Sequence, residues 1–379
     1  MRTLIVGAGI AGLTLAGLLA RQGKSPVVID RRPDGAGLGY ALALWPHGSR
    51  VFHALGVHEE FVAASEPMRT YVARGATGEL LTRSPLPHSI ASFGHLGIIP
   101  RADLLGMLHG ALDGVEVRDG VGIASLTQAQ DHVEVGFDDG TAETFDLVVG
   151  ADGIHSRVRT LLLGRVALRD TGWGCYVWWA DPRLAATGET TERWGAGSFV
   201  GTYPCREHLC VIAGAPVETL DPDRREGRSD RLSALLQSYG TQATELLADL
   251  PGDDEPLYLW PMSDVRSPRW VQGRVALVGD AAAAFLPTAG IGASMALESA
   301  AALADEVSRT DATYLPNALH LYQRRRRHRV EAAQAQSRRL ARLMFLSSPR
   351  LASVRNRGLR FASMEQMVGP LIDDLREPI

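Results

Sequence analysis

A glycine-rich turn near the N-terminus restricts this chain to a small set of folds. The turn follows residues 2–6 (RTLIV), which predict a buried strand because the run is apolar, rich in β-branched residues and ends abruptly. Residues 10–22 then predict a helix, and residues 26–30 (PVVID) predict a second buried strand. A strand, a turn, a helix and a strand in this order form a βαβ unit, so the sequence predicts a parallel sheet.

The same turn predicts what the unit binds. It matches the GxGxxG pattern between a strand and a helix, where glycines allow a pyrophosphate to approach the free N–H groups of the helix N-terminus. Asp30 ends the second strand, near the usual place of an acid that binds an adenosine ribose. Arg31 and Arg32 beside it leave the choice between NAD and FAD open. The sequence therefore predicts a dinucleotide site at Gly7, Gly9, Ile10, Ala11, Gly12, Asp30 and Arg31.

Two later segments repeat the pattern of a strand that ends in a glycine and an aspartate. They are DLVVGADG at residues 146–153 and RVALVGDAA at residues 274–282. The carboxyl ends of parallel strands meet at one edge of a sheet, where open α/β sheets bind ligands. We therefore expect both segments to converge with the N-terminal turn.

The middle of the chain has a different character. Segment 115–145 predicts a β meander with a turn at 138–140, and the chain from Ala293 onward predicts helices. Short aromatic and β-branched runs predict a second, mainly antiparallel sheet. These runs are residues 171–180, 197–203, 208–214 and 257–262.

Composition and charge exclude several classes of function. The 39 basic and 43 acidic residues give a net charge of −4, so the sequence shows no excess of positive charge that would bind nucleic acid or an anionic membrane. The arginine run 324–327 with Arg329 predicts a solvated helix face. Lys24 is the only lysine, and no apolar run is long enough to predict a membrane span. Three irregularly spaced cysteines predict neither a disulfide framework nor a metal site, so we expect a cytoplasmic protein without a metal.

Three motifs together resemble those of one enzyme family. Residues 150–153 (GADG), followed by Ser156 and Arg159, resemble the DGxxSxxR motif of flavin-dependent aromatic hydroxylases. Residues 279–292, which contain GDA, a proline and GIG, resemble the second FAD fingerprint of that family. Arg101, which follows a proline before a predicted helix, matches an arginine of the same family.

The order and rough spacing of these motifs agree over residues 1–310, so the chain resembles the single-component FAD-dependent monooxygenases typified by para-hydroxybenzoate and salicylate hydroxylases. The resemblance implies an α/β fold with a Rossmann-like, GR2-type FAD-binding domain interleaved with a mainly antiparallel substrate domain. The implied segments are 1–72, 100–170 and 264–340 for the FAD domain, 73–99 and 171–263 for the substrate domain, and 341–379 for a C-terminal helical tail.

The resemblance also implies roles for single positions. Asp30 resembles the ribose-binding acid, and Arg101 resembles the arginine near the FAD phosphates and ribityl chain. Ile123 stands where the family has a backbone contact to the adenine end. Asp152 resembles an acid involved in FAD and NAD(P)H contacts, and Asp280 resembles the ribityl-binding aspartate. The loop packed on the isoalloxazine ring would comprise Pro287, Gly290, Ile291, Gly292, Ala293 and Ser294.

Some positions depart from the family pattern. Ala283 stands where the family usually has histidine, and Ile291 and Ser294 replace a common glutamine and asparagine. These changes reduce the number of polar contacts expected on one side of the flavin. They make the mobility of the flavin and the class of substrate harder to infer.

In the family that the chain resembles, NAD(P)H reduces FAD, and the reduced flavin forms a C4a-hydroperoxide that delivers oxygen to an electron-rich ring. The resemblance thus implies FAD as cofactor, NADPH or NADH as transient co-substrate, O2, and a small aromatic or heteroaromatic substrate, in a monomer or homodimer. Two alternatives stay open: an FAD-dependent reductase or dehydrogenase that does not activate oxygen, and a non-catalytic flavoprotein that binds and protects an intermediate.

The substrate is expected between the flavin and the aromatic sheet. Trp178 and Trp179 point to opposite faces of a strand, so at most one of them faces the substrate. We name Trp178 and Tyr203 as candidates, with His47 in the WPHG turn as a third. No residue is assigned as a general base.

Overall fold

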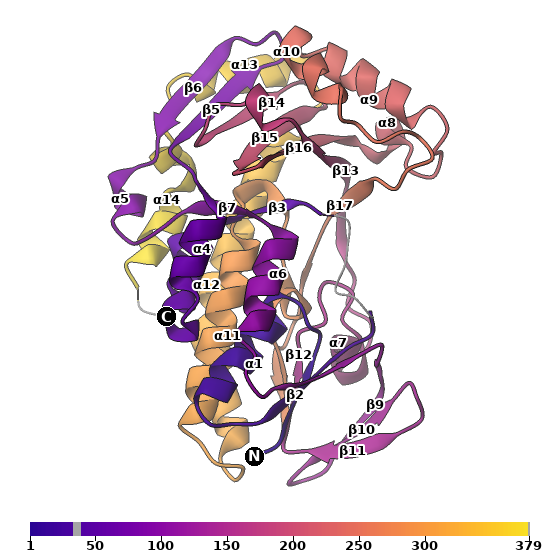
Figure 1. Cartoon of the computed structure of the whole chain (residues 1–379), viewed down its shortest axis with the longest axis vertical. Coiled ribbons are helices and arrows are strands. Elements are labelled where there is room, and N and C mark those ends of the chain that lie inside the picture. Colours follow the sequence, from indigo (N-terminus) through magenta and orange to yellow (C-terminus); the bar gives the residue numbers. More distant parts are fainter. Residues whose placement is uncertain (33–38, 378–379) are drawn as a thin grey trace.

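Two β-sheets stand at opposite ends of the molecule, and long helices run beside and between them (Figure 1). The computed structural model describes residues 1–32 and 39–377. Sequence order does not follow this division, because both the N-terminal and the C-terminal parts of the chain contribute to each end.

The six-stranded sheet has the order β18-β19-β12-β1-β2-β8. All neighbours pair in parallel except β18 and β19, which are antiparallel. Strands β1 and β12 are buried along their whole length, and β12 and the part of β1 after Thr3 are apolar, as expected for parallel strands covered on both faces. The strands are β1 (Thr3–Val6), β2 (Pro26–Asp30), β8 (Glu116–Asp119), β12 (Leu147–Gly150), β18 (Val271–Gln272) and β19 (Val275–Leu277).

This sheet confirms the predicted βαβ unit and the convergence of the three strand ends. Helix α1 (Ile10–Arg21) connects β1 to β2 and packs on α11 (Gly292–Ser308). Because β12 lies between β1 and β19, the carboxyl ends of these three strands are adjacent at one edge.

The predicted meander over 115–145 divides between two sheets. Strand β8 joins the six-stranded sheet, where it pairs in parallel with β2 and Val117 lies beside Val28. The remaining strands form a separate antiparallel sheet in the order β11-β10-β9. Their bounds are β9 (Ile123–Gln128), β10 (Val133–Phe137) and β11 (Ala142–Phe145).

The eight-stranded sheet has the order β20-β17-β13-β16-β15-β14-β5-β6. It contains the four aromatic runs predicted as strands, and its pairs are antiparallel except for parallel β14 and β5. The strands are β5 (Thr70–Gly75), β6 (Leu80–Pro85), β13 (Arg169–Ala180), β14 (Glu189–Trp194), β15 (Phe199–Cys205), β16 (His208–Pro216), β17 (Tyr258–Arg266) and β20 (Ala283–Ala284). A second three-stranded sheet has the order β3-β7-β4, with β3 (Ala41–Leu44), β7 (Gly97–Pro100) and β4 (Glu66–Pro67).

Helices cover the sheets and join them. The helices not yet named are α2 (Pro46–Ser49), α3 (Val51–Leu55), α4 (His58–Ala64), α5 (His88–Ala91), α6 (Arg101–Gly110), α7 (Arg157–Leu163), α8 (Val217–Leu220), α9 (Arg228–Gln237), α10 (Thr241–Thr244), α12 (Leu315–Met344), α13 (Pro349–Leu359) and α14 (Met364–Leu375). Single 3₁₀ turns occur at η1 (Pro182–Leu184), η2 (Glu245–Leu247), η3 (Gly279–Ala281) and η4 (Pro287–Ala289). Within the described ranges, no helix combines the length and apolarity that crossing a membrane requires.

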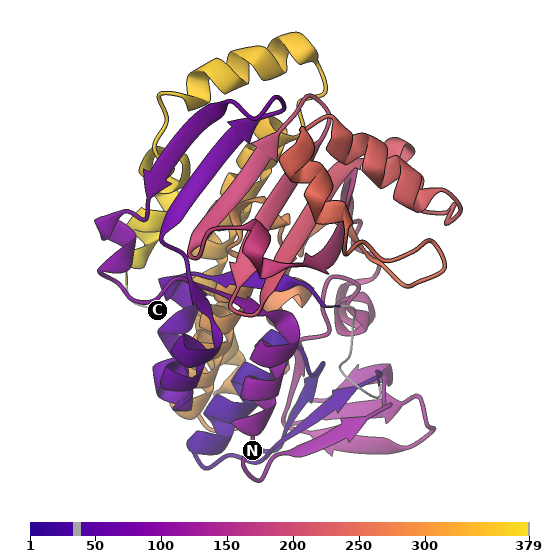
Figure 2. The ribbon, with the colours of Figure 1, turned by 45° about the horizontal axis from the view of Figure 1, so that its top comes forward.

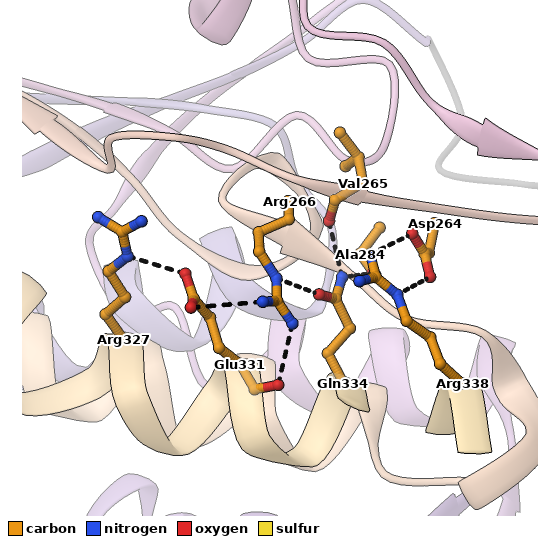
Figure 3. A network of polar contacts seen from close by, with 8 residues as sticks. All are labelled: Asp264, Val265, Arg266, Ala284, Arg327, Glu331, Gln334 and Arg338. Atoms are coloured by element: carbon orange, nitrogen blue, oxygen red, sulfur yellow. Dashed lines mark hydrogen bonds and ion pairs between the residues drawn. The ribbon is translucent and has the colours of Figure 1, made fainter. Parts of the chain in front are cut away.

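Helix α12 is tied to the edge of the eight-stranded sheet by polar side chains (Figure 3). Buried Gln334 donates to the carbonyl oxygens of Val265 (2.8 Å) and Ala284 (2.6 Å) and accepts from Arg266 (2.8 Å). One turn further on, Arg338 binds the buried carboxylate of Asp264 at 2.6 and 2.7 Å. These contacts satisfy carbonyls of β17 and β20, and they fix the start of the loop that leads to α11.

The arginine run on α12 is not the solvated face that its sequence predicts. Arg326 and Arg329 are buried and bind Glu298 of α11 at 2.8 and 3.1 Å, and Arg50 also pairs with Glu298. Of the other arginines in the run, Arg324 is exposed, and Arg325 and Arg327 are half-buried. Arg326 and Arg329 are buried because α11 packs against α12 and carries the fully buried carboxylate of Glu298. A buried charge of this kind needs cationic partners.

The C-terminal segment covers the eight-stranded sheet and α12. Helix α12 continues past residue 340, so it crosses the predicted start of the tail. Figure 2 shows α13 beside the outer strands β5 and β6, and α14 packs on α12. Phe345, between α12 and α13, stacks on Trp173 of the sheet with ring centroids 4.3 Å apart.

Candidate active site

A cavity of about 810 Å³ lies between the two large sheets. One end is lined by the residues that follow β1, β12 and β19, and the other end is lined by side chains of β5, β14, β15 and β17. Both the volume and a lining in which apolar surface exceeds polar surface are typical of sites for small ligands and cofactors.

The glycines of the N-terminal turn shape the first end of the cavity. Gly7 has φ +112°, and a Cβ there would lie 2.5 Å from the carbonyl oxygen of Ala151. A Cβ at Gly12 would lie 1.9 Å from the carbonyl oxygen of Gly7, so Gly12 serves the packing of α1 against the turn. Gly9 caps α1 without a side-chain hydrogen bond, lines the cavity and has open space where its Cβ would be. The uncapped N–H groups of α1 therefore face space that suits a phosphate.

Asp30 closes the same end from β2. The residue is mostly buried, with 8% exposed, and its carboxylate accepts from the backbone N–H groups of Ala8 (2.8 Å) and Arg32 (2.9 Å). Arg31 also lines the cavity, and so does Ile123 at the start of β9. The carboxylate is thus held beside the glycine turn, where it can accept hydrogen bonds from ribose hydroxyls.

Asp280, in η3, and Arg101, at the start of α6, both line the cavity. Asp280 is surrounded by protein but accessible from the cavity, and its burial raises the pKa of its carboxyl to about 6, while Arg159 acts in the opposite direction. Arg101 begins α6 after Pro100, and its guanidinium lies 5.8 Å from the ring centroid of Tyr40. An aspartate and an arginine arranged in this way can bind the hydroxyl and phosphate groups of a dinucleotide.

The DGxxSxxR residues have a clear structural function. Asp152 accepts from Ser156 Oγ (2.5 Å) and from the N–H groups of Arg157 (2.6 Å) and Val158 (3.0 Å), so its carboxylate caps α7. Buried Arg159 donates to the carbonyl oxygens of Ala281 (3.0 Å) and Ile154 (2.6 Å). Asp152 also lines the cavity, and burial raises the pKa of its carboxyl. The motif thereby joins the turn after β12 to the turn that carries Asp280.

The loop before α11 reaches the cavity with some of its predicted residues only. Ser294 is buried and its Oγ accepts from the backbone N–H of Trp45 at 3.0 Å, whereas Ile291 packs in the core. Neither residue lines the cavity. The predicted residues of this loop that do line it are Pro287, Gly290, Gly292 and Ala293.

The three substrate candidates occupy different environments. Tyr203 lines the cavity. Trp178 lies on the other face of the sheet, where its Nε1 donates to the carbonyl oxygen of Leu246 at 2.9 Å. His47 is fully buried beneath the cavity wall, and burial lowers the pKa of its ring to about 3. The structure places neither Trp178 nor His47 on the cavity, because strand alternation and the close packing of α2 on α11 turn them away from it.

Several cavity residues were not predicted from the sequence. The sheet end contains Tyr71, Glu192 and Trp260, and α14 adds Met364 and Met367. A buried acid within an otherwise regular strand, as in ETTERW, is a signal that could have indicated Glu192. No comparable signal marks the methionines, because their approach depends on how the C-terminal helices fold back.

The arrangement fits FAD. Backbone N–H groups and an arginine could hold a pyrophosphate, carboxylates could accept from ribose and ribityl hydroxyls, and the glycines of the loop before α11 leave space for a ring system. No cluster of three or more His, Cys, Asp or Glu side chains that could hold a metal occurs in the ranges that the structure describes.

Comparison with known proteins agrees with this geometry. The family model described as "FAD binding domain" matches residues 1–337. The chain is 30% identical over 361 residues to 2-heptyl-3-hydroxy-4(1H)-quinolone synthase of Pseudomonas aeruginosa, covering 94% of this chain and 93% of that protein. It is 31% identical over 310 residues to 3-amino-4-hydroxybenzoate 2-monooxygenase of Streptomyces cremeus, covering 79% and 76%.

A solved structure shares the whole fold. HpxO of Klebsiella pneumoniae, complexed with FAD and uric acid, matches with a TM-score of 0.89 and 25% identity over 99% of this chain and 96% of that chain. The family model covers most of the chain, one of these relatives is named as a monooxygenase, and the residues that line the cavity fit FAD. This chain therefore belongs to the FAD binding domain family, as an FAD-dependent oxidoreductase of the aromatic monooxygenase group.

Proposed function

We propose that the protein uses FAD, NAD(P)H and O2 to hydroxylate a small aromatic or heteroaromatic compound. The observation that carries this proposal is the continuity of one cavity from the dinucleotide turn to the aromatic side of the eight-stranded sheet. A ring system seated at the loop before α11 would face that sheet, with room for a second flat molecule between them. Relatives named for quinolones and aminohydroxybenzoates support an aromatic substrate.

The chain's own residues bind and orient, and they exclude water. Asp30 would hold the adenosine ribose, Arg101 the phosphates, and Asp280 the ribityl chain. FAD, when bound, supplies the redox chemistry by accepting a hydride from NAD(P)H and, in its reduced form, activating O2. The apolar loop residues Pro287 and Ala293 and the aromatic side chains of the sheet would keep the reacting region dry.

Buried, unpaired cysteines support a reducing, cytoplasmic compartment, where NAD(P)H is also available. We expect a monomer or a homodimer, which sedimentation of the FAD-loaded protein measures directly.

An anaerobic titration of the FAD-loaded protein with NADPH and then NADH, followed at the visible flavin band, tests the proposal. We expect one nucleotide to bleach the band and an aromatic ligand to accelerate the bleaching. Readmitting ¹⁸O2 should then place one labelled oxygen atom in the product. Bleaching without label in any product would indicate a reductase instead, and a flavin that neither nucleotide bleaches would contradict the proposal.

A further inference from the structure

At the sheet end of the cavity, one buried carboxylate stands among aromatic side chains. Glu192 lies on β14, where Thr190, Glu192 and Trp194 alternate with residues of the opposite face and all line the cavity. Glu192 is 9% exposed. Among the described residues of the eight-stranded sheet that line the cavity, Glu192 is the one with a charged side chain.

Neighbouring strands hold this carboxylate in one position. Tyr71 of β5 and Tyr203 of β15 donate their hydroxyls to Glu192 at 2.7 and 2.8 Å, and Trp194 donates Nε1 at 2.9 Å. Gly201 is paired with Glu192 across the strands, and a Cβ there would lie 2.5 Å from the Tyr203 hydroxyl. The missing side chain thus gives the Tyr203 ring room to reach Glu192.

These neighbours supply hydrogen bonds but no positive charge. Burial, reinforced by Glu192, raises the pKa of Tyr71 and of Tyr203 well above its ordinary value, so both remain neutral donors. Oε2 accepts two of the three bonds and Oε1 accepts one, which leaves acceptor capacity on Oε1. No basic side chain in the described ranges pairs with Glu192.

The arginines that line the cavity come from elements other than the eight-stranded sheet. Arg31 and Arg32 follow β2, Arg101 begins α6 and Arg157 begins α7. A buried carboxylate without a cationic partner is costly unless something else completes its pairing. The missing partner would be provided by a molecule that enters the sheet end of the cavity.

We propose that Glu192 is a substrate-binding residue that selects aromatic compounds carrying a cationic nitrogen and excludes those with a carboxylate at that end. The inference rests on the proposed function, because it assumes that the substrate occupies the sheet end. The cation would bind Oε1 of Glu192 by a charge-assisted hydrogen bond. A carboxylate in the same place would meet a like charge, and among the described residues no arginine of the eight-stranded sheet lines the cavity to pair with it.

Three matched phenols test this selection in the FAD-loaded protein: tyramine (cationic), para-ethylphenol (neutral) and para-hydroxyphenylpropanoate (anionic). Dissociation constants come from perturbation of the flavin absorbance. We expect tyramine to bind roughly tenfold more tightly than para-ethylphenol or better, and the anion to bind most weakly, because hydrogen bonds to buried charges are among the strong ones. Glu192→Gln should abolish the preference while keeping full FAD occupancy.

Matched variants separate recognition from folding. Glu189→Gln removes an acid from the same strand, where it pairs with Arg83 at 2.8 Å away from the cavity, and should leave the preference unchanged. Tyr203→Phe removes one donor but keeps the Glu192 charge, so it should still favour tyramine even if Glu192→Gln does not fold. Equal binding of the three probes by the unaltered protein, failure of all of them to bind, or a preference that survives in a folded Glu192→Gln variant would each overturn the proposal.

Reduction of the flavin by NAD(P)H, measured in the same samples, distinguishes this inference from the proposed function. A protein that prefers tyramine but is never reduced would retain the cation site and lose the monooxygenase assignment. Conversely, NAD(P)H could reduce the flavin in both the unaltered protein and the Glu192→Gln variant, and both could hydroxylate an anionic ring equally well. That result would support the monooxygenase activity and contradict the cation site.

Discussion

Single glycines in the N-terminal turn perform different tasks, although one motif contains them all. The carbonyl oxygen of Gly7 occupies the place of a Cβ at Gly12, so Gly12 is required for the turn to pack on α1. Gly9 has no such neighbour and borders the cavity. The sequence pattern alone does not separate a glycine needed for folding from one needed for ligand approach.

Two alanine substitutions test this distinction. Gly12→Ala should lower the free energy of unfolding of the apoprotein by about 1–3 kcal/mol or more, because the new methyl overpacks the turn. Gly9→Ala should leave that free energy within about 0.5 kcal/mol but weaken FAD binding by roughly tenfold, because its methyl enters the phosphate space. Urea unfolding and FAD titration measure the two effects. Equal behaviour of the two variants would contradict the assignment.

Asp280 is expected to give the apoprotein a distinctive pH dependence. Its pKa of about 6, raised by burial, exceeds that of an aspartate in the unfolded chain, so the folded state holds the extra proton between about pH 4 and pH 6. The contribution of this group to stability is therefore full at low pH and is lost as the pH rises through 6. In Asp280→Asn this part of the slope should disappear from thermal midpoints recorded between about pH 4 and pH 7. Identical slopes in both proteins would show that Asp280 titrates normally.

At the level of elements, buried charges fix how α11 and α12 pack. Glu298 is fully buried on α11 and meets arginines from α12 and from the segment after α2. Burial acts to raise the pKa of Glu298, but Arg326 and Arg329 outweigh it and hold that pKa below the usual value. The cluster therefore specifies one alignment of the two helices behind the cavity wall.

Glu298→Gln should destabilise the protein by about 3–5 kcal/mol, because it leaves buried guanidinium groups without their carboxylate. Urea unfolding of the FAD-free protein measures the loss. Glu207→Gln, at an exposed position, serves as the control and should change stability by less than about 0.5 kcal/mol. A loss as small as that of the control would mean that water reaches the cluster.

For the whole molecule, the cavity is the region where the two large sheets meet, so FAD bound in it would contact both. A ligand that binds only the folded state stabilises it by mass action. FAD at about 100 times its dissociation constant should thus raise the free energy of unfolding by about 2.7 kcal/mol and shift the thermal midpoint upward. The Gly9→Ala variant should show a smaller shift at the same FAD concentration. An unchanged midpoint in the unaltered protein would contradict FAD binding to the folded chain.

Much of the dinucleotide end of the cavity could be predicted from the sequence because its signals are local. The turn after β1, the acid that ends β2 and the glycine-aspartate pairs after β12 and β19 each occupy a few consecutive residues. Parallel pairing then brings the strand ends together without further information. The resemblance of the motifs to one family supplied the cofactor, which the GxGxxG pattern left open.

The sheet end of the cavity was decided by tertiary structure. Tyr71, Glu192 and Tyr203 meet only because β14 pairs in parallel with β5 and antiparallel with β15, and β5 lies far from both in sequence. The same dependence on long-range packing buries His47, turns Trp178 to the far face and brings α14 over the cavity. By itself, therefore, the sequence determined the fold class and the cofactor end, since these rest on short-range backbone geometry. The sheet end of the cavity was set by side chains from distant segments, whose positions depend on strand register and helix packing.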